Sequence, residues 1–257
     1  MLKRFLYPSG LGSGAEGTGP VETNRVVYFE DDVESGTLLT TDAPPGQWDY
    51  VVGLAGTVTA SGAAAHAGSY GIQIHYEDLT PPADVNRYVV KDGFGLTHLF
   101  CRAYVKFHVN AGGSTDFVQR KLFWFDNGVA LGGFDWTVIL TSWWVTPIDG
   151  KVWLAMTANV GPGGTPWQDY DLAALNYDTW YCIELEVTMN TPGVDDGRYS
   201  LWVDDALVAS GTGKSYSGTN ANPISRFRLG EQADSGAVVD EERYWDDVVI
   251  AATKTGL

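Results

Sequence analysis

The sequence is short of positive charge. Its 257 residues include 16 Lys and Arg against 32 Asp and Glu, which gives a formal net charge of −16 at pH 7. A general nucleic-acid binder needs clustered basic residues to contact phosphates, so we expect no nucleic-acid partner. Cysteine is scarce too. Cys101 and Cys182 both fall inside expected strands, where buried free thiols are a better interpretation than a disulfide.

Long apolar runs and targeting signals are also absent. No stretch of about 20 apolar residues occurs, so we expect no membrane insertion. The first residues, M-L-K-R-F-L-Y-P-S-G, do not form a signal peptide, because their apolar stretch is short and Pro8 interrupts it. These features predict a protein made in a cytoplasm and not exported by the usual route.

Common enzyme motifs are missing as well. The chain has no P-loop, no dinucleotide fingerprint, no G-x-S-x-G elbow and no zinc-spaced Cys/His set. Helical periodicity is rare, and residues 169–175 are the best candidate for a short helix. Instead, 31 Gly, 11 Pro and 13% aromatic residues suit many short strands joined by turns.

Alternating patterns dominate what is present. Tyr199, Leu201 and Val203 alternate with polar residues, which is the period-two pattern of a β-strand. Asp204-Asp205 then predicts a tight turn, because Asp tolerates positive φ better than most residues. About fourteen such segments predict an all-β fold, a two-sheet antiparallel β-sandwich.

Five short motifs appear in a characteristic order. They are F-E at 29–30, H-x-G-S-Y-G-I-x-I at 66–74, W-Y-x-I-E-L at 180–185, Y-x-L-W-V-D at 199–204 and D-D-V at 246–248. This order resembles the concanavalin A-like lectin/glucanase superfamily in its laminin-G-like jelly-roll branch, although Asp205 stands where that family usually has Gly. The resemblance spans about residues 26–252 and implies a jelly roll with its first and last strands side by side. It implies no single function, because this sandwich hosts lectins, hydrolases, lyases and structural modules.

The N-terminal segment differs from the rest of the chain. Residues 1–25 are Gly-rich and have little to bury, so we expect an extended arm followed by one sandwich domain of residues 26–257. Phe5, Leu6 and Tyr7 are candidates for burial in a partner of this arm. That partner is either a second copy of the chain or, if the chain belongs to a virus particle, another virion subunit.

One predicted strand carries a candidate binding surface. In residues 98–109 the apolar row, which must face the core, is Leu99, Cys101, Ala103, Val105, Phe107 and Val109. The opposite row is His98, Phe100, Arg102, Tyr104, Lys106 and His108. Strands near 86–91 and 117–125 add Arg87, Lys91 and either Arg120 or Lys121, depending on register. Together they predict a basic, aromatic groove for an acidic polysaccharide, the alternative being a solvated face that balances the acidic surface.

Two fragments resemble catalytic motifs of the same superfamily. Gln73-Ile74-His75 matches the Q-I-H triplet of its alginate-lyase-like members, but the partner motifs R-x-E-L and Y-F-K-x-G are missing. If a lyase site existed, the resemblance implies His75 as base and Tyr104 as acid. Glu184-x-Glu186 resembles the glucanase E-x-D-x-E strand, but its central Asp is replaced and its third carboxylate is missing. We therefore expect no catalytic residues.

Two further sets of residues are candidate ligand sites. The resemblance implies a structural Ca²⁺ where the first and last strands meet, and its ligands would be Glu30, Asp32, Asp246 and Asp247, which are otherwise solvated strand ends. No other cofactor is expected. Trp143 and Trp144 are adjacent, so they point to opposite faces of a strand, and Trp144 is a candidate sugar platform.

Three functions remain open at this stage. The favoured one is a non-enzymatic virion structural protein of a bacterial virus, made in the host cytoplasm and displayed on the virion surface. It would be a capsid decoration or tail accessory subunit, held by the arm. The second is a carbohydrate-binding module that takes a surface polysaccharide. Its residues are His75, Arg102, Tyr104, Lys106, His108 and Trp144. The third is a polysaccharide lyase or glycoside hydrolase.

Overall fold

The computed structural model describes most of the chain from Val26 onward. The described residues are 26–53, 57–76, 86–109, 120–128, 137–143, 151–159, 166–217, 219, 223–232 and 241–254. The predicted arm with Phe5, Leu6 and Tyr7, and also Trp144, lie outside them.

The described residues form two antiparallel sheets. One has eight strands: β1 (Val27–Asp31), β3 (Val58–Ser61), β4 (Gly71–Tyr76), β6 (His98–Val109), β11 (Tyr181–Thr188), β12 (Gly197–Val203), β13 (Ala206–Lys214) and β15 (Glu241–Ala251). The other has seven: β2 (Tyr50–Val52), β5 (Asn86–Leu96), β7 (Arg120–Asp126), β8 (Thr137–Trp143), β9 (Lys151–Asn159), β10 (Trp167–Asn176) and β14 (Ile224–Gln232). A single 3₁₀ turn, Gly62–Ala64, is the one helical element in these ranges.

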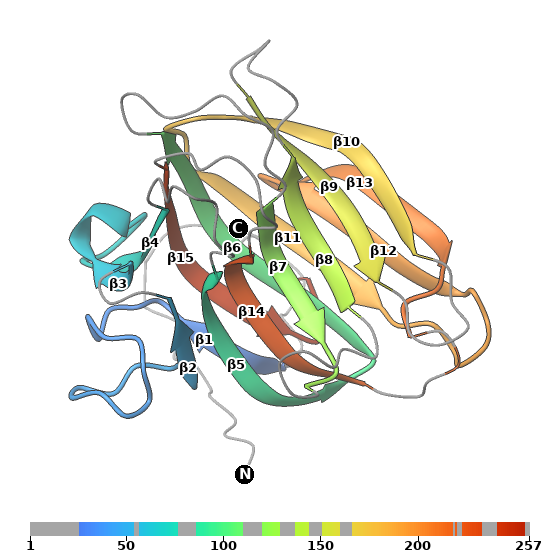
Figure 1. The fold of residues 1–257 in the computed structure, drawn as a ribbon, viewed down its shortest axis with the longest axis horizontal. Coiled ribbons are helices and arrows are strands. Elements are labelled where there is room, and N and C mark those ends of the chain that lie inside the picture. Colours follow the sequence, from blue (N-terminus) through green and yellow to red (C-terminus); the bar gives the residue numbers. More distant parts are fainter. Residues whose placement is uncertain are drawn as a thin grey trace, which may run out of the picture.

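The two sheets stack face to face (Figure 1), which confirms the predicted two-sheet sandwich. The order of the eight-stranded sheet is β13-β12-β11-β6-β15-β4-β3, with β1 also beside β15. The order of the seven-stranded sheet is β10-β9-β8-β7-β14-β5-β2. Val27 pairs with Ala251, so the first and last described strands are neighbours, as the resemblance implied.

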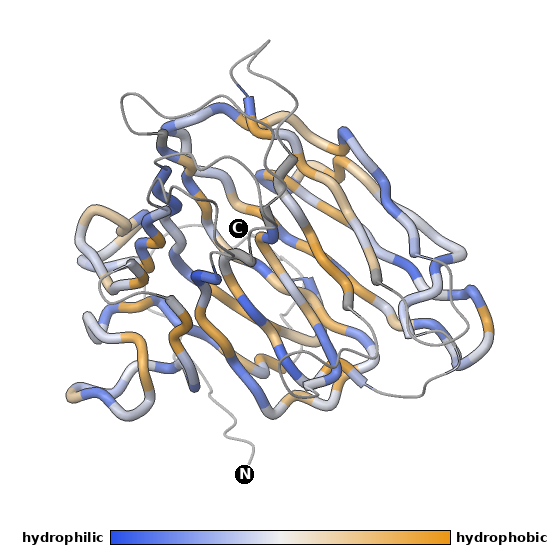
Figure 2. Tube along the Cα trace, in the orientation of Figure 1, coloured by the Kyte–Doolittle hydropathy of each residue, from blue (hydrophilic) through white to orange (hydrophobic). Residues whose placement is uncertain are grey.

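Alternation along each strand builds the core. On β6 the row predicted to face inward is buried, with Leu99, Val105 and Phe107 at 0% exposure. Phe123 of β7 and Phe227 of β14 meet this row from the other sheet and contact each other at 5.9 Å between ring centroids. Burying such a side chain contributes about 1.5–3 kcal/mol. Figure 2 shows the resulting alternation of hydrophobic and hydrophilic residues along the strands.

Two local predictions have opposite outcomes. Asp204 and Asp205 have φ of 48° and 63°, which is the left-handed geometry of a tight hairpin turn and confirms that prediction. Residues 169–175 are not helical but belong to β10, where a bulge between Asp169 and Ala173 interrupts the pairing with β9. The period-two pattern was hidden by this bulge and by the positive φ of Asp171, 55°.

Strands that follow one another along the chain often lie in different sheets. β5 and β7 belong to the seven-stranded sheet, whereas β6 between them belongs to the eight-stranded sheet. The expected groove, which joined residues 86–91, 98–109 and 117–125, is therefore wrong, because its parts lie on opposite sides of the sandwich. β14 inserts between β5 and β7, where Arg228 pairs with both Val90 and Trp124.

Cys101 and Cys182 are free and buried, as predicted. Cys101 faces the core from β6, and Cys182 lies beside Tyr104 on the other face of the same sheet. Within the ranges given above, no helix is long and apolar enough to cross a bilayer.

Candidate functional site

The surface of the eight-stranded sheet that points away from the core collects most of the predicted glycan-binding residues. We call it the eight-stranded outer face. Arg102, Tyr104, Lys106 and His108 project here from β6 and are partly exposed, while their neighbours in sequence face the core. His75 reaches the same face from β4, with β15 between the two strands. These five residues share one face, and their role in glycan binding stays a prediction.

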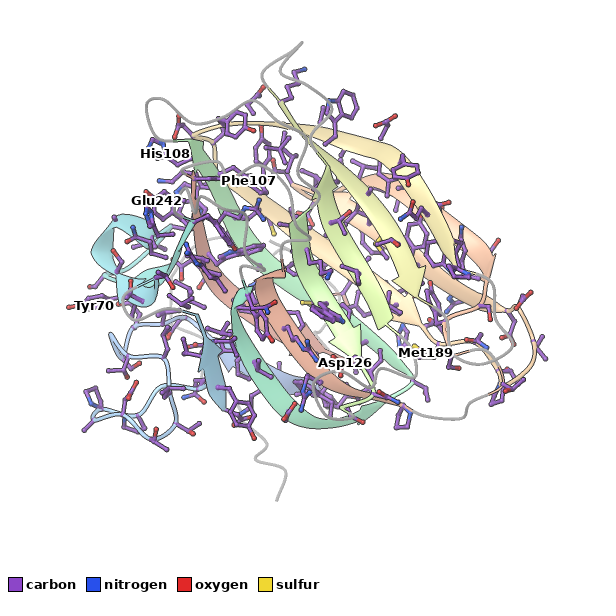
Figure 3. The ribbon with its side chains drawn as sticks, viewed as in Figure 1. Tyr70, Phe107, His108, Asp126, Met189 and Glu242 are labelled. Atoms are coloured by element: carbon purple, nitrogen blue, oxygen red, sulfur yellow. The ribbon has the colours of Figure 1, made fainter. Side chains whose placement is uncertain are left out.

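Acidic groups accompany every histidine of the chain on this face. The sequence has four His. The nitrogen–oxygen distances are 4.0 Å for His66–Asp247, 3.3 Å for His75–Glu242, 3.0 Å for His98–Glu186 and 2.6 Å for His108–Asp178. Figure 3 shows His108 and Glu242 close together at one end of the sandwich. These carboxylates offset the positive charge on which the prediction of an acidic ligand depended.

Glu184 and Glu186 also project onto this face. Glu184 pairs in register with Arg102 and lies 3.5 Å from Lys254 Nζ, while Glu186 contacts His98. Both carboxylates are therefore engaged with basic side chains.

The predicted calcium ligands all lie in the described part of the chain. No group of three or more His, Cys, Asp or Glu there is arranged to hold a metal ion. Asp246 accepts backbone N–H groups from His66 and Ala67 at 2.7 and 3.1 Å, and burial raises the pKa of its carboxyl. A calcium site formed by Glu30, Asp32, Asp246 and Asp247 remains a prediction.

The seven-stranded sheet also has a face that points away from the core, and we call it the seven-stranded outer face. Three of its side chains are as buried as the core: Trp124 is 2% exposed, Arg228 1% and Asp126 0%. Tyr88 of β5 lies beside them with 3% exposure. The centre of this face is thus enclosed, unlike its counterpart.

Two ion pairs lie on this face, one fully buried and one partly exposed. Arg228 Nη2 lies 2.7 Å from Asp126 Oδ2, and Arg226 donates two hydrogen bonds to Asp92, at 2.6 and 3.0 Å. Burial raises the pKa of Asp126 and lowers that of Arg228, so enclosure opposes the charge of both partners. The hydrogen bonds to Asp92 raise the pKa of Arg226 and keep it charged.

Lys121 joins this cluster because of a bulge. Lys121 pairs with Thr141 of β8 and Phe123 pairs with Leu140, so β7 has one residue more than its partner. Strict alternation would put Lys121 on the core side with Phe123, and the extra residue turns it outward. Its Nζ lies 4.5 Å from the centre of the Trp124 ring, and Arg228 Cζ lies 4.0 Å from the same ring. Lys121 is only partly buried, whereas Trp124 and Arg228 are fully buried.

Sequence reasoning missed this cluster, although part of the signal was present. In R-F-R-L-G-E the apolar Phe227 and Leu229 must face the core, so Arg226 and Arg228 must face away from it. The outward direction of Lys121 had no such signal, because the sequence does not show the bulge.

Comparisons with known proteins identify the fold but no sequence family. No protein-family model and no curated protein matches the chain. An endo-β-1,4-glucuronan lyase from the fungus Trichoderma reesei is similar over 88% of this chain and 96% of its own, with TM-score 0.65 and 15% identity. A PL-14 alginate lyase from Aplysia kurodai is similar over 88% of this chain and 99% of its own, with TM-score 0.63 and 15% identity.

A third neighbour was solved with substrate. This is a variant of the alginate lyase Aly36B, with a lysine and a tyrosine replaced by alanine, in complex with an alginate tetrasaccharide. The match covers 77% of this chain and 88% of that chain, with TM-score 0.53 and 14% identity. At such identities the likeness shows the fold alone, which agrees with a concanavalin A-like jelly roll.

Proposed function

We propose that this protein is a polysaccharide lyase that binds an acidic, uronate-containing polymer on the seven-stranded outer face. The observation that carries the proposal is Lys121, which a bulge turns out of the core onto the Trp124–Arg228 stack. Bulges re-aim side chains next to active sites in many folds. The names of the neighbours, lyases of glucuronan and alginate, support the same chemistry.

The cations of this face suit a carboxylate-bearing sugar. Arg228 shares the Trp124 ring with Lys121, Arg226 lies two residues earlier in β14, and guanidinium groups match carboxylates geometrically. Their pairs with Asp92 and Asp126 hold them in place before a ligand arrives. Pre-positioned charge of this kind stabilises negative charge that develops during a reaction.

The proposed reaction is a β-elimination. Neutralising the uronate carboxylate stabilises the carbanion that forms at C5, and the neutral amine of Lys121 takes the C5 proton. The electron pair left by that proton forms the C4–C5 double bond while the C4–O4 bond breaks. Lys121 then gives the proton to the departing O4, so it ends the reaction as it began.

The test measures the ultraviolet absorbance of the unsaturated product during incubation with glucuronan or alginate. We expect Lys121→Ala to lower the rate by about 10²-fold or more, the usual contribution of a proton-transfer group. Lys254→Ala is the matched control, because Lys254 Nζ lies over Trp202, 5.1 Å from its ring centre, on the other outer face. It should leave the rate unchanged.

Three results would contradict the proposal. Wild-type protein inactive on both polymers would reject a lyase acting on them. Binding that depends on Lys121 without cleavage would reduce the function to carbohydrate binding. Loss of activity in His75→Ala or Tyr104→Ala, but not in Lys121→Ala, would move the site to the eight-stranded outer face.

The virion role remains a prediction. Its expected anchor, residues 1–25, lies outside the described ranges, and no comparison supports the role. Size-exclusion chromatography with light scattering, on the full chain and on a chain without residues 1–25, tests whether that segment drives assembly.

A further inference from the structure

A compact group of rings lies on the eight-stranded outer face, on the side of the sandwich opposite Lys121. The His66 ring stacks on Tyr104 with centroids 3.8 Å apart, and it meets Trp180 edge-on at 5.3 Å. Lys106 Nζ sits between Trp180 and Tyr244, at 5.0 and 4.6 Å from their ring centres. We call these five residues the aromatic shelf. His66 is exposed, and Tyr104, Lys106 and Trp180 are partly exposed, so the shelf reaches solvent.

The shelf is held in place from below by a bulge in β15. The pairing of β15 with β6 shifts between Asp246 and Val249, and Asp247 takes a positive φ of 49°. Asp246, only 1% exposed, accepts N–H groups from His66 and Ala67. The buried carboxylate thereby fixes the backbone that presents the His66 ring to Tyr104, and the shelf needs little reorganisation to receive a ligand.

The charges around the shelf disfavour an acidic ligand. Glu242 accepts a hydrogen bond from Tyr244, Asp178 lies 2.6 Å from His108, and Asp247 lies 4.0 Å from His66. Lys106 is the lysine or arginine within the shelf, and these three carboxylates surround it. A polymer of uronic acids would be repelled here, whereas the hydroxyl groups of an uncharged sugar can donate to the carboxylates.

We propose that the aromatic shelf is a second carbohydrate-binding surface, which holds a neutral polysaccharide. The apolar faces of sugar rings stack on Trp180 and Tyr104, and sugar hydroxyls hydrogen-bond with Lys106 and the surrounding carboxylates. This surface is independent of the proposed lyase site, because the two outer faces lie on opposite sides of the core. Its effect is to tether the protein to a neutral matrix while the other face remains available to an acidic chain.

Affinity electrophoresis tests the shelf directly. Native gels are run with hydroxyethyl cellulose, xylan or glucuronan in the matrix, and without polymer. We expect at least one neutral polymer to retard the wild-type protein. Trp180→Ala should weaken that retardation about tenfold or more in apparent affinity. The matched control is Trp202→Ala, a partly exposed tryptophan of the same face that stacks near Phe100, and it should bind as wild type.

Two outcomes would overturn the proposal. One is that neither neutral polymer retards the wild-type protein. The other is that Trp180→Ala and Tyr104→Ala, shown by thermal melting to be folded, are retarded as strongly as wild type. The proposals for the shelf and for the lyase site can be refuted independently. Lys121→Ala should still bind neutral polymers, and Trp180→Ala should still cleave glucuronan.

Discussion

Ion pairs on the two outer faces lie in opposite surroundings. His108 and Asp178 on the eight-stranded outer face have side chains 36% and 66% exposed, while Arg228 and Asp126 on the seven-stranded outer face are 1% and 0% exposed. Water screens the first pair, so its geometry has little energetic weight. The second pair has lost its hydration, and each partner depends on the other. Two ion pairs with similar nitrogen–oxygen distances thus contribute differently to the free energy of unfolding.

Each face has a bulge that sets the position of a charged side chain, and the comparison shows two uses of the same irregularity. The β7 bulge exposes a charged group, because it turns Lys121 away from the core. The β15 bulge buries one, because Asp246 beneath it holds the backbone of His66. In the two proposals above, one irregularity supplies the proton-transfer group, and the other supports the carbohydrate-binding surface.

The largest effect is expected from breaking the buried pair. Asp126→Ala removes the carboxylate 2.7 Å from the desolvated Arg228 guanidinium. Removing one partner of a buried pair costs about 3–5 kcal/mol, so urea denaturation should show a loss of this size. Asp126→Asn, which keeps the acceptor for the Gly128 N–H, should lose less. A loss below about 1 kcal/mol for Asp126→Ala would show that this face is not as enclosed as its exposure indicates.

The effect of intermediate size is a change of stability with pH. It tests whether the burial of a group, and not the sheet to which the group belongs, determines its energetics. Asp31 belongs to β1 of the eight-stranded sheet but is 4% exposed, and burial raises its pKa to about 6. The folded state therefore binds this proton more tightly than the unfolded state. The resulting stability is complete below the ordinary pKa and is lost as pH rises through about 6. The shift corresponds to at most about 3 kcal/mol.

The variant Asp31→Asn tests this dependence. Asn keeps an oxygen that can accept the Val33 N–H and cannot ionise, so we expect the variant to gain stability over wild type as pH rises. Urea denaturation between about pH 4 and about pH 8 measures the difference. Parallel stability curves for the two proteins would show that the pKa of Asp31 is the same in the folded and the unfolded state, so that burial does not raise it.

The smallest effect is expected on the exposed face. Asp178→Ala removes the carboxylate next to His108, and an exposed pair of this kind contributes about 0–1 kcal/mol. Its thermal midpoint should stay near that of wild type, and added salt should change it little. A loss as large as that of Asp126→Ala would remove the energetic contrast between the faces.

The sequence predicted those parts of the molecule that depend on alternation and on local turn chemistry. On β6 the apolar Leu99, Val105 and Phe107 alternate with polar and aromatic residues, which predicted correctly that the latter point outward. Asp204-Asp205 formed the expected turn. Alternation does not show to which sheet a strand belongs, so Lys121 was grouped with residues of the opposite face. Nor does it show bulges, which set the direction of Lys121 and the position of His66.

The placement of β14 between β5 and β7 has a consequence for the order of synthesis. Val90, Trp124 and Arg228 become neighbours only when this late strand joins two strands translated long before it. A nascent chain released before residue 232 therefore lacks a complete β14 and has no finished enclosed face. Contacts between such distant segments also form slowly during folding. The enclosed cations thus come together only after β14 has been translated, and a chain terminated before it would carry the aromatic residues of β6 without them.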